Sequence, residues 1–490
     1  MTGNAMNHKQ NMAELTEDSQ DTALKTESAL AEKQDAARGD RPSKTARPVI
    51  AGLTMKDGFP VMPGRIPLLG HVHKIGQDAL GELRKAEAAC GPMFWTYFGS
   101  KLPVLQILDE EGLAILQNKY TDNSFLREQM PVITGEAMNA FDGPRHRNAR
   151  RASMDAFSPK GLTRAQVGQF IEETIAKRLN NWTGKDKLAI FPETKDIALE
   201  VVFRIMGIET AELSQWRHQY EEFFLGMIPL KVDLPGFPAW RCRKARGWLE
   251  ERVGRIVADA RARNDRDSMV GAMVFGRDDD GNGMSEVELV HNILGLGFAG
   301  SETTAAVMAW SALMLSQHPD VWRRLCEEVA ALDRLPHTQE ELSRQTPLAE
   351  AVFRETMRLY PPAPFEMRKA HTEFDMMGHK VPAGTMVGVS LLHVSRNPER
   401  YPEPDRWLPD RWLGVDRALS QVETCQFGGG PHACLGRHVA ALEITLFIAM
   451  LARALGSKGI APKLAGKMPP PAYLPFLRPS NKAFLNLAGR

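Results

Sequence analysis

One stretch of the sequence constrains the fold more than any other: Phe427-Gly428-Gly429-Gly430-Pro431-His432-Ala433-Cys434-Leu435-Gly436. It places Cys434 in a tight turn of glycine and proline, directly before an apolar run at 439–451 that predicts a helix. Backbone N–H groups of the turn and of the helix start are expected to point toward the sulfur. They should lower the pKa of Cys434 and hold its side chain as a thiolate.

The cysteine stretch favours one kind of metal chemistry over another. It lacks the paired Cys and His spacing of a zinc site, so zinc is not predicted. A lone thiolate does suit the axial position of a haem iron, where its electron donation favours cleavage of an O–O bond. The alternative is a structural cysteine in a glycine-rich turn, which a short motif does not exclude.

A long buried helix is expected to follow a polar loop at 278–283. Ser285 offers an N-cap and Glu288, three residues on, completes the pattern of a capping box. Residues 287–315 are apolar on nearly all sides, which predicts a helix surrounded by other parts of the protein.

The middle of this helix carries polar groups that need an explanation: Ala299-Gly300-Ser301-Glu302-Thr303-Thr304. The Thr303 hydroxyl can divert a backbone hydrogen bond and open the helix to water. Glu302 beside it can act as a general acid or base. The other interpretation is an ordinary threonine-rich helix with Glu302 facing solvent.

Two further clusters carry charge at helical spacing. Glu355 and Arg358 lie at i, i+3 on an amphipathic helix that should begin near Thr346 and Pro347, so they can pair. His146 and Arg150 lie at i, i+4, and such a pair of donors can bind carboxylates, which Arg can grip with two hydrogen bonds.

Together these motifs resemble, in the same order, those of the cytochromes P450, over about residues 59 to 485. Five positions match the family's haem-ligand signature, namely Phe427, Gly430, His432, Cys434 and Gly436. The segment at 299–304 resembles the family's oxygen-activation motif. Glu355 and Arg358, followed by Pro409-Asp410-Arg411-Trp412, resemble a buried ion triad of the family.

The resemblance implies a role for each candidate residue. Cys434 becomes the axial thiolate of haem b, and Thr303 and Glu302 become the alcohol and the acid that deliver protons to oxygen. Four side chains become donors to the haem carboxylates: His146, Arg150, Arg368 and His432. Glu355, Arg358 and Arg411 become the structural triad that stabilises the fold around the cysteine turn.

Composition agrees with a large enzyme and argues against some other classes. The 490 residues include 61 basic and 60 acidic side chains, a net charge of +1 that gives no support for nucleic-acid binding. Five scattered cysteines do not form a disulfide framework, so we expect a reducing, cytoplasmic location. The polar segment at 1–47 contains no stretch of about 18 to 20 apolar residues, so we expect no N-terminal membrane anchor.

We expect a disordered polar tail at 1–50 and one haem-thiolate domain at 51–490, because the tail has almost no large apolar side chains to bury. The fold class implied by the resemblance is mainly α, the cytochrome P450 fold with a small β-rich subdomain. Within that subdomain, 94–98 and 104–108 predict a hairpin, and 376–392 a second β-rich patch.

The implied function is a monomeric haem-thiolate monooxygenase of secondary metabolism. It would insert one oxygen atom from O2 into a hydrophobic small molecule of the terpenoid, sterol-like, fatty-acid or polyketide class. A ferredoxin and a ferredoxin reductase would supply electrons from NAD(P)H. Two alternatives stay open: a haem-thiolate isomerase or dehydratase that needs no redox partner, and a non-catalytic haem- or lipid-binding protein.

The resemblance also suggests which side chains line the substrate pocket. The apolar members of this expected lining are Phe125, Met130, Val132, Phe223, Phe224, Met227, Phe298, Phe365 and Phe476. Such a lining suits a hydrophobic ligand. Glu366 is the polar exception, and we weigh contact with a substrate amine or hydroxyl against pairing with Arg368 or with water.

Overall fold

The computed structural model describes residues 53–117, 119–227, 232–415 and 417–489. The polar tail predicted at 1–50 lies outside the described residues. The described residues from Leu53 onward belong to a single unit with its own hydrophobic core.

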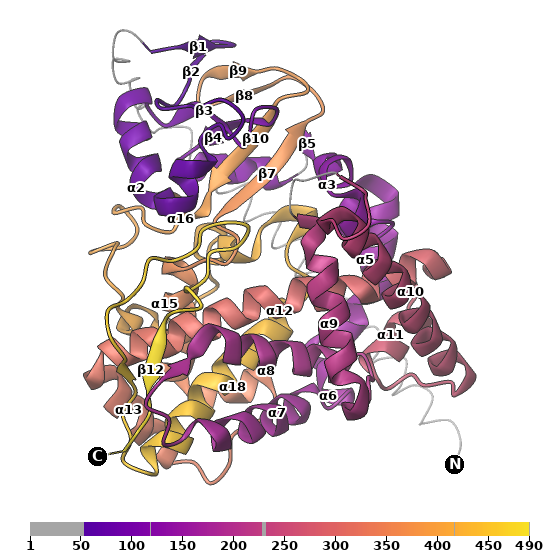
Figure 1. Ribbon diagram of the computed structural model, residues 1–490, viewed down its shortest axis with the longest axis vertical. Coiled ribbons are helices and arrows are strands. Elements are labelled where there is room, and N and C mark those ends of the chain that lie inside the picture. Colours follow the sequence, from indigo (N-terminus) through magenta and orange to yellow (C-terminus); the bar gives the residue numbers. More distant parts are fainter. Residues whose placement is uncertain (1–52, 118, 228–231, 416, 490) are drawn as a thin grey trace, which may run out of the picture. The chain divides into compact units, whose positions relative to one another are not determined.

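Most of the described residues are helical (Figure 1). The helices are α2 (Val72–Cys90), α3 (Ser124–Gln129), α4 (Pro131–Thr134), α5 (Gly143–Phe157), α6 (Pro159–Arg164), α7 (Val167–Trp182), α8 (Ile190–Ile205), α9 (Leu213–Phe224), α10 (Pro238–Ala262), α11 (Met269–Phe275), α12 (Glu286–Gln317), α13 (Pro319–Ala330), α14 (Gln339–Gln345), α15 (Pro347–Leu359), α16 (Leu391–Val394), α17 (Gln421–Thr424) and α18 (Arg437–Gly456). The mainly α class predicted from the sequence is confirmed.

The long helix α12 runs through the middle of the helical part and packs most extensively against α8 (Figure 1). The Ser285 hydroxyl accepts a hydrogen bond from the Glu288 N–H, and the Glu288 carboxylate accepts one from the Ser285 N–H. The predicted capping box is therefore confirmed. Most side chains between Leu289 and Leu315 are buried, which the apolar pattern around the whole helix predicted.

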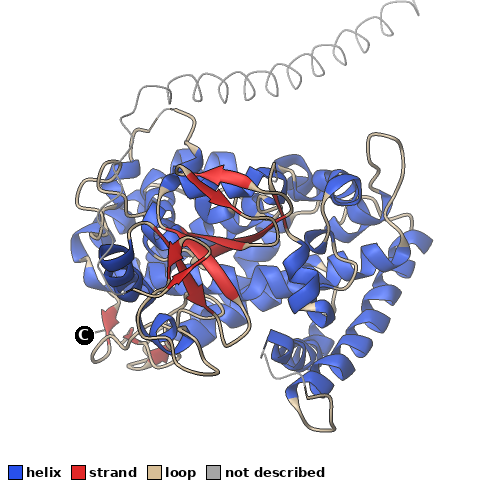
Figure 2. Ribbon diagram, turned by 90° about the horizontal axis from the view of Figure 1, so that it is seen from above, coloured by secondary structure: helices blue, strands red, loops and turns tan. Residues whose placement is uncertain are grey.

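Within the described part of the chain, the strands are short and form four separate sheets. They are β1 (Met55–Lys56), β2 (Phe59–Pro60), β3 (Met93–Tyr97), β4 (Pro103–Ile107), β5 (Thr121–Asp122), β6 (Leu188–Ala189), β7 (Phe365–Ala370), β8 (Phe374–Met376), β9 (His379–Val381), β10 (Met386–Ser390), β11 (Lys463–Leu464) and β12 (Phe484–Asn486). The largest sheet has the order β3-β4-β10-β7-β5. Figure 2 shows most strands gathered over one side of the helices.

The predicted hairpin is confirmed, because β3 and β4 pair antiparallel with Met93 opposite Ile107. β10 then joins this hairpin by parallel pairing of Val387 with Leu105, which connects chain segments far apart in the sequence. The second predicted β-rich patch is present as β8, β9 and β10. The sequence did not predict β7, which pairs antiparallel with both β10 and β5.

The helix after the cysteine stretch, α18, is the core of the C-terminal part. It is longer than predicted, and its residues from Leu442 to Ala452 are all buried. Among the described helices it alone has the length and apolar composition that would allow a membrane span, yet two thirds of the relevant window is buried inside the protein. A core helix has the same properties, so its apolar composition is explained by packing.

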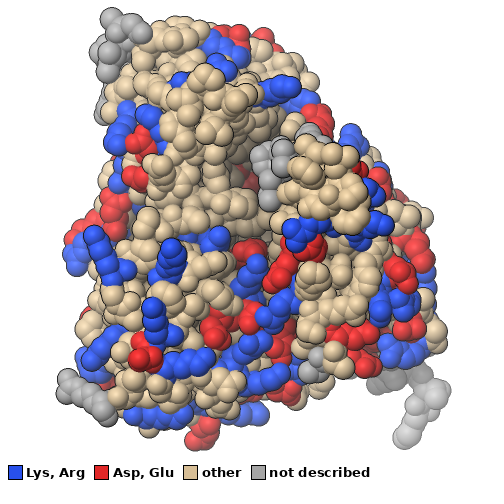
Figure 3. Space-filling view, in the orientation of Figure 1, with Lys and Arg blue, Asp and Glu red and all other residues tan. Residues whose placement is uncertain are grey.

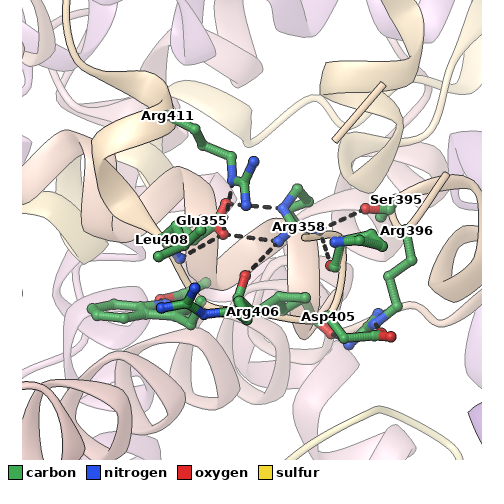
Figure 4. Close-up of polar contacts among 12 residues, drawn as sticks. Glu355, Arg358, Ser395, Arg396, Asp405, Arg406, Leu408 and Arg411 are labelled. Carbon is green, nitrogen blue, oxygen red and sulfur yellow. Dashed lines mark hydrogen bonds and ion pairs between the residues drawn. The ribbon is translucent and has the colours of Figure 1, made fainter. Parts of the chain in front are cut away.

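The predicted ion triad is formed, and Figure 4 shows Arg358 and Arg411 both directed toward Glu355. Glu355 accepts hydrogen bonds from Arg358 at 2.8 and 2.9 Å and from Arg411 at 3.1 Å. The Leu408 N–H and the Trp412 indole donate to the same carboxylate. Glu355 and Arg358 are fully buried, so their charges are satisfied by each other and by the surrounding backbone.

Candidate active site

A cavity of about 320 Å³ lies between α12, α5 and the cysteine stretch. Its described lining comprises Ala137, Met138, Asn139, His146, Arg150, Phe157, Val202, Ile205, Met269, Asn292, Gly295, Leu296, Ala299, Gly300, Thr303, Thr304, His432, Ala433, Cys434, Leu435, Gly436, Val439, Ala440 and Glu443. Five of the seven residues predicted for the site line this cavity, whereas Glu302 and Arg368 do not.

The face of the molecule shown in Figure 3 is hollowed between the β-rich part and the helices near α3 and α9. Few charged side chains lie on the rim of this hollow, whereas Lys, Arg, Asp and Glu alternate over the helices below it. A rim with few charges is compatible with an opening that admits hydrophobic ligands.

Local backbone geometry fixes the position of Cys434. Gly428 and Gly430 adopt positive φ angles of 73° and 60°, and a side chain at Gly430 would overlap the Leu116 carbonyl. The Cys434 N–H donates to the Phe427 carbonyl at 2.8 Å and closes the turn. Helix α18 begins directly afterwards, so the sulfur is held at a helix start and opens into the cavity.

The sequence predicted that the turn lowers the pKa of the Cys434 thiol, and for the protein without a bound metal this prediction is wrong. Burial raises the pKa of the Cys434 thiol, and this effect outweighs the Gly436 N–H and the charges of Arg150 and Arg437, which lower it. The side chain is accessible only because it opens into the cavity, where surrounding protein still removes it from bulk water. A stable thiolate here therefore requires a further positive charge, such as a bound metal ion.

Thr303 faces the cavity, as the sequence predicted. Its hydroxyl donates to the Ala299 carbonyl at 2.6 Å, which is a bond to the backbone one turn earlier. Gly300 lies beside it in the cavity wall, and its missing side chain leaves that face of α12 open.

Glu302 is neither in the described cavity wall nor free in solvent. Its carboxylate lies 2.5 Å from the Lys195 ammonium of α8, and the Glu302 side chain is 12% exposed. The pair connects α12 to α8. The interpretation of Glu302 as a solvent-facing residue is therefore wrong.

Cationic and hydrogen-bonding side chains gather at one end of the cavity. His146 and His432 lie ring against ring at 4.1 Å, and His432 shares a hydrogen bond of 2.8 Å with Asp142. Burial, with the nearby charges of His432 and Arg150, lowers the pKa of His146 to about 4. Burial alone would raise the pKa of Asp142, but hydrogen bonds from His432 and from the Asn123 N–H lower it overall.

Arg150 is a cation in the cavity wall for which the described residues show no partner. Its guanidinium has no hydrogen-bond or ion-pair partner among the described residues, although it lines the cavity. Burial lowers the pKa of this group, which is normally far above neutral, so Arg150 remains charged. A buried charge of this kind needs an anionic partner.

Arg368 lies on β7 and is 4% exposed. It bonds Glu366 at 3.1 Å and the Met367 carbonyl at 2.8 Å, so Glu366 pairs with Arg368 as one of the two interpretations predicted. Its Nε–H is buried without a partner. Arg368 thus retains an unused donor, like Arg150.

The described lining includes none of the nine apolar side chains predicted for the substrate pocket. Four of them instead form one aromatic cluster, in which Phe298 of α12 contacts Phe223, Phe224 and Phe476 at centroid distances of 5.4 to 6.4 Å. The sequence missed Glu443 of α18, which lines the cavity although the surrounding residues form an apolar core helix. An acid inside the apolar run of this helix was the signal that could have found it.

The residues of this cavity fit the predicted haem. A sulfur opens into it from a glycine-rich turn, and an unpaired Arg150 and two histidines supply donors for carboxylates. Side chains on Gly295 and Gly436 would project into open space, which leaves room for a flat group. The orphaned Arg368 Nε–H is consistent with one more anionic acceptor.

Comparisons with known proteins all point to one protein family. The family model described as "Cytochrome P450" matches residues 60–455. The chain is 36% identical over 423 residues to the cytochrome P450 BJ-4 homolog of Sinorhizobium fredii, covering 86% of this chain and 94% of that protein. It is 29% identical to cyclooctat-9-en-7-ol 5-monooxygenase of Streptomyces melanosporofaciens, covering 80% and 87%.

A solved structure supports the same fold. The retinoic acid bound cyanobacterial CYP120A1 superposes with a TM-score of 0.75 at 24% identity, covering 87% of this chain and 99% of that chain.

Proposed function

This chain belongs to the cytochrome P450 family, and on that premise we propose that it transfers one oxygen atom from O2 to a hydrophobic small molecule. The family's cofactor is haem b, and the enzyme is a cytochrome P450 monooxygenase. The observation that carries the proposal is that Cys434 and Thr303 line one cavity.

The protein would hold the haem through its sulfur and its cations. Cys434 would supply the sulfur that holds the haem iron, since its side chain opens into the cavity from a rigid turn. His146, Arg150 and His432 would donate to the haem carboxylates, and the unused Arg368 Nε–H supports a contribution from β7. Because Arg150 has no other partner, its charge would be satisfied only by such an anion.

The haem, once bound, supplies the chemistry of dioxygen activation. Thr303 would hold a proton-donating water or ligand at its Oγ1, which is anchored by the Ala299 carbonyl. Glu302 would relay a proton from solvent toward this site, and its ion pair with Lys195 would fix the position of its carboxylate on α12.

The proposed substrate class is a hydrophobic small molecule of terpenoid type. The cavity wall combines Leu296, Ala299 and Val439 with few charged groups, and the aromatic cluster around Phe298 lies on the same helix. A relative with 29% identity carries the name cyclooctat-9-en-7-ol 5-monooxygenase, which supports an unsaturated cyclic alcohol or hydrocarbon as the first compounds to examine.

Cytochromes P450 need redox partners, and for this chain we propose a separate ferredoxin and ferredoxin reductase driven by NAD(P)H. We also propose a cytoplasmic location, because bacterial relatives of this type are named among the matches. We further propose that the protein is a monomer.

The test is oxygen incorporation by the haem-loaded full chain. The enzyme is supplied with a ferredoxin, its reductase, NADPH and ¹⁸O-labelled O2, together with cyclic terpene alcohols that shift the haem spectrum on binding. We expect one labelled oxygen atom in the product for each NADPH oxidised. Product that forms without NADPH, and without label, would contradict the proposal and favour an isomerase or dehydratase.

A further inference from the structure

Glu443 is an acid in a place where the fold provides no reason for one. It lies on α18, nine residues after Cys434, and is 2% exposed. It shares one helix face with Val439 and Ala440, at i−4 and i−3, and all three line the haem cavity.

The carboxyl group has no polar partner among the described residues. Its Oε1 is completely buried without a hydrogen bond, and the structure shows no donor to Oε2. Buried carboxylates elsewhere in the same core are satisfied: Glu350 of α15 bonds Arg354, Ser343 and Thr445, the last of these only two residues from Glu443. Glu443 is therefore an exception within its own helix neighbourhood.

An ionised carboxylate without partners is very unfavourable inside a protein, so the neutral acid is the stable form. Burial alone raises the pKa of Glu443 to about 8, and no charged group of the described residues opposes this shift. The ionisable groups that face the cavity are His146 and Arg150 from α5 and His432 and Cys434 from the cysteine turn. A neutral carboxyl keeps an O–H donor, and the cavity is the place where it can find an acceptor.

We propose that Glu443 is an uncharged carboxylic acid in the wall of the haem cavity, and that its ionisation makes the reduction potential of the haem iron depend on pH. The proposal rests on the haem of the proposed enzyme but not on the oxygenation reaction. Glu443 would act on the haem through its charge alone, and no hydrogen bond connects it to Cys434 in the structure.

The coupling follows from charge balance. Reduction adds one electron, which comes from the redox partner or, in a titration, from dithionite. Where Glu443 is ionised, its negative charge opposes that electron, and one proton from solvent joins the carboxylate as the iron is reduced. Where Glu443 is already protonated, the electron enters alone. The reduction potential should therefore fall as pH rises through about 8 and stay level at lower pH.

The experiment uses the haem-loaded full chain in two measurements that need no substrate. The first is a spectroelectrochemical titration of the haem between about pH 6 and about pH 9, around the value expected for Glu443. The wild type should show a falling potential above neutral pH. Glu443→Gln, which cannot ionise, should keep the low-pH potential of the wild type over the whole range.

The second measurement is the infrared band of a protonated carboxyl in the wild type at neutral pH, identified by its shift in D2O. It should be absent in Glu443→Gln and retained in Glu350→Gln, a matched change at a buried carboxylate that has partners. A missing band in the wild type would overturn the proposal, and so would the same pH dependence of the potential in Glu443→Gln. Neither result depends on turnover, so a failure of the proposed oxygenation would leave this test valid.

Discussion

The Thr303 hydroxyl donates to the Ala299 carbonyl at 2.6 Å, one turn earlier in the same helix, α12. The Ala299 carbonyl thereby accepts from a side chain within the wall of the cavity that Cys434 also lines. The Thr303 hydroxyl can turn from this carbonyl toward a ligand at a low cost in free energy. The carbonyl would remain hydrogen-bonded, because backbone N–H groups of the helix lie beside it.

Removing this hydroxyl should separate NADPH oxidation from product formation. Thr303→Ala should still bind haem and substrate, and its free energy of unfolding should change by about 1 kcal/mol, as expected for one partly buried hydroxyl. Without the hydroxyl, protons reach the reduced oxygen less selectively, so much of the flux should leave as hydrogen peroxide. The ratio of product to NADPH, with peroxide assayed in parallel, measures this.

Thr303→Ser is the matched control, because it keeps the hydroxyl and loses only a methyl group. It should retain most of the wild-type ratio of product to NADPH. An unchanged ratio in Thr303→Ala would remove this side chain from the mechanism.

Arg150→Gln should weaken haem retention. The unpaired guanidinium would lose its hydrogen bonds to a haem carboxylate, which are worth roughly 1.5–3 kcal/mol when a charge is involved. We expect haem transfer to apomyoglobin to become about ten- to a hundredfold faster. Arg147→Gln, on the exposed side of the same helix, should transfer haem at the wild-type rate. Equal rates in both variants would contradict the assignment of Arg150.

Glu355→Gln should be strongly destabilising, because the buried Arg358 would lose its carboxylate and keep its charge. The expected loss is about 3 to 5 kcal/mol in the free energy of unfolding, measured by urea denaturation. Glu327→Gln breaks an exposed pair with Arg323 on α13 and should cost at most about 1 kcal/mol. Similar losses in the two variants would show that burial of the triad does not matter.

His393 should make the protein sensitive to acid. Burial, together with the charges of Arg84 and Arg396, lowers the pKa of His393 to about 3, so the folded protein keeps this ring neutral. In the unfolded chain the imidazole has its ordinary pKa of about 6.5, so the unfolded state takes up a proton more readily than the folded state. The stability that this group contributes is therefore present above about pH 6.5 and is lost as pH falls toward 3.

Between pH 7 and pH 5 this loss should amount to about 2 kcal/mol. His393→Gln should lose less stability over that interval than the wild type, by a comparable amount, in urea denaturation at the two pH values. His218→Gln, an exposed position on α9, should behave as the wild type does. Parallel pH dependence in wild type and His393→Gln would refute the role assigned to this ring.

The sequence predicted those parts of the fold that are determined by a few neighbouring residues. The capping box at Ser285 and the tight turn before Cys434 are written within a few residues, and each appears in the structure as expected. Strand β7 was missed because Glu366, Arg368 and Lys369 give it the composition of a polar segment. It becomes a strand only through pairing with β10 and β5.

In the candidate site, too, features set by neighbouring residues were predictable and features set by distant residues were not. The sequence could place Thr303 on the cavity face of α12, but the direction of Glu302 is decided by Lys195, more than one hundred residues away. The pKa of Cys434 was mispredicted because desolvation depends on everything packed around the sulfur, which a turn of ten residues does not reveal. The position of Glu443 within an apolar run was visible in the sequence, but its lack of partners is a property of the packed core.

The central claim is that Cys434 binds the haem iron as a thiolate. The most direct measurement is the absorption spectrum of the reduced, carbon monoxide-treated protein, in the wild type and in single Cys→Ala variants. Cys434→Ala should lose the red-shifted band that a thiolate ligand produces, while Cys90→Ala, Cys242→Ala, Cys326→Ala and Cys425→Ala should keep it. Retention of that band in Cys434→Ala would contradict the account.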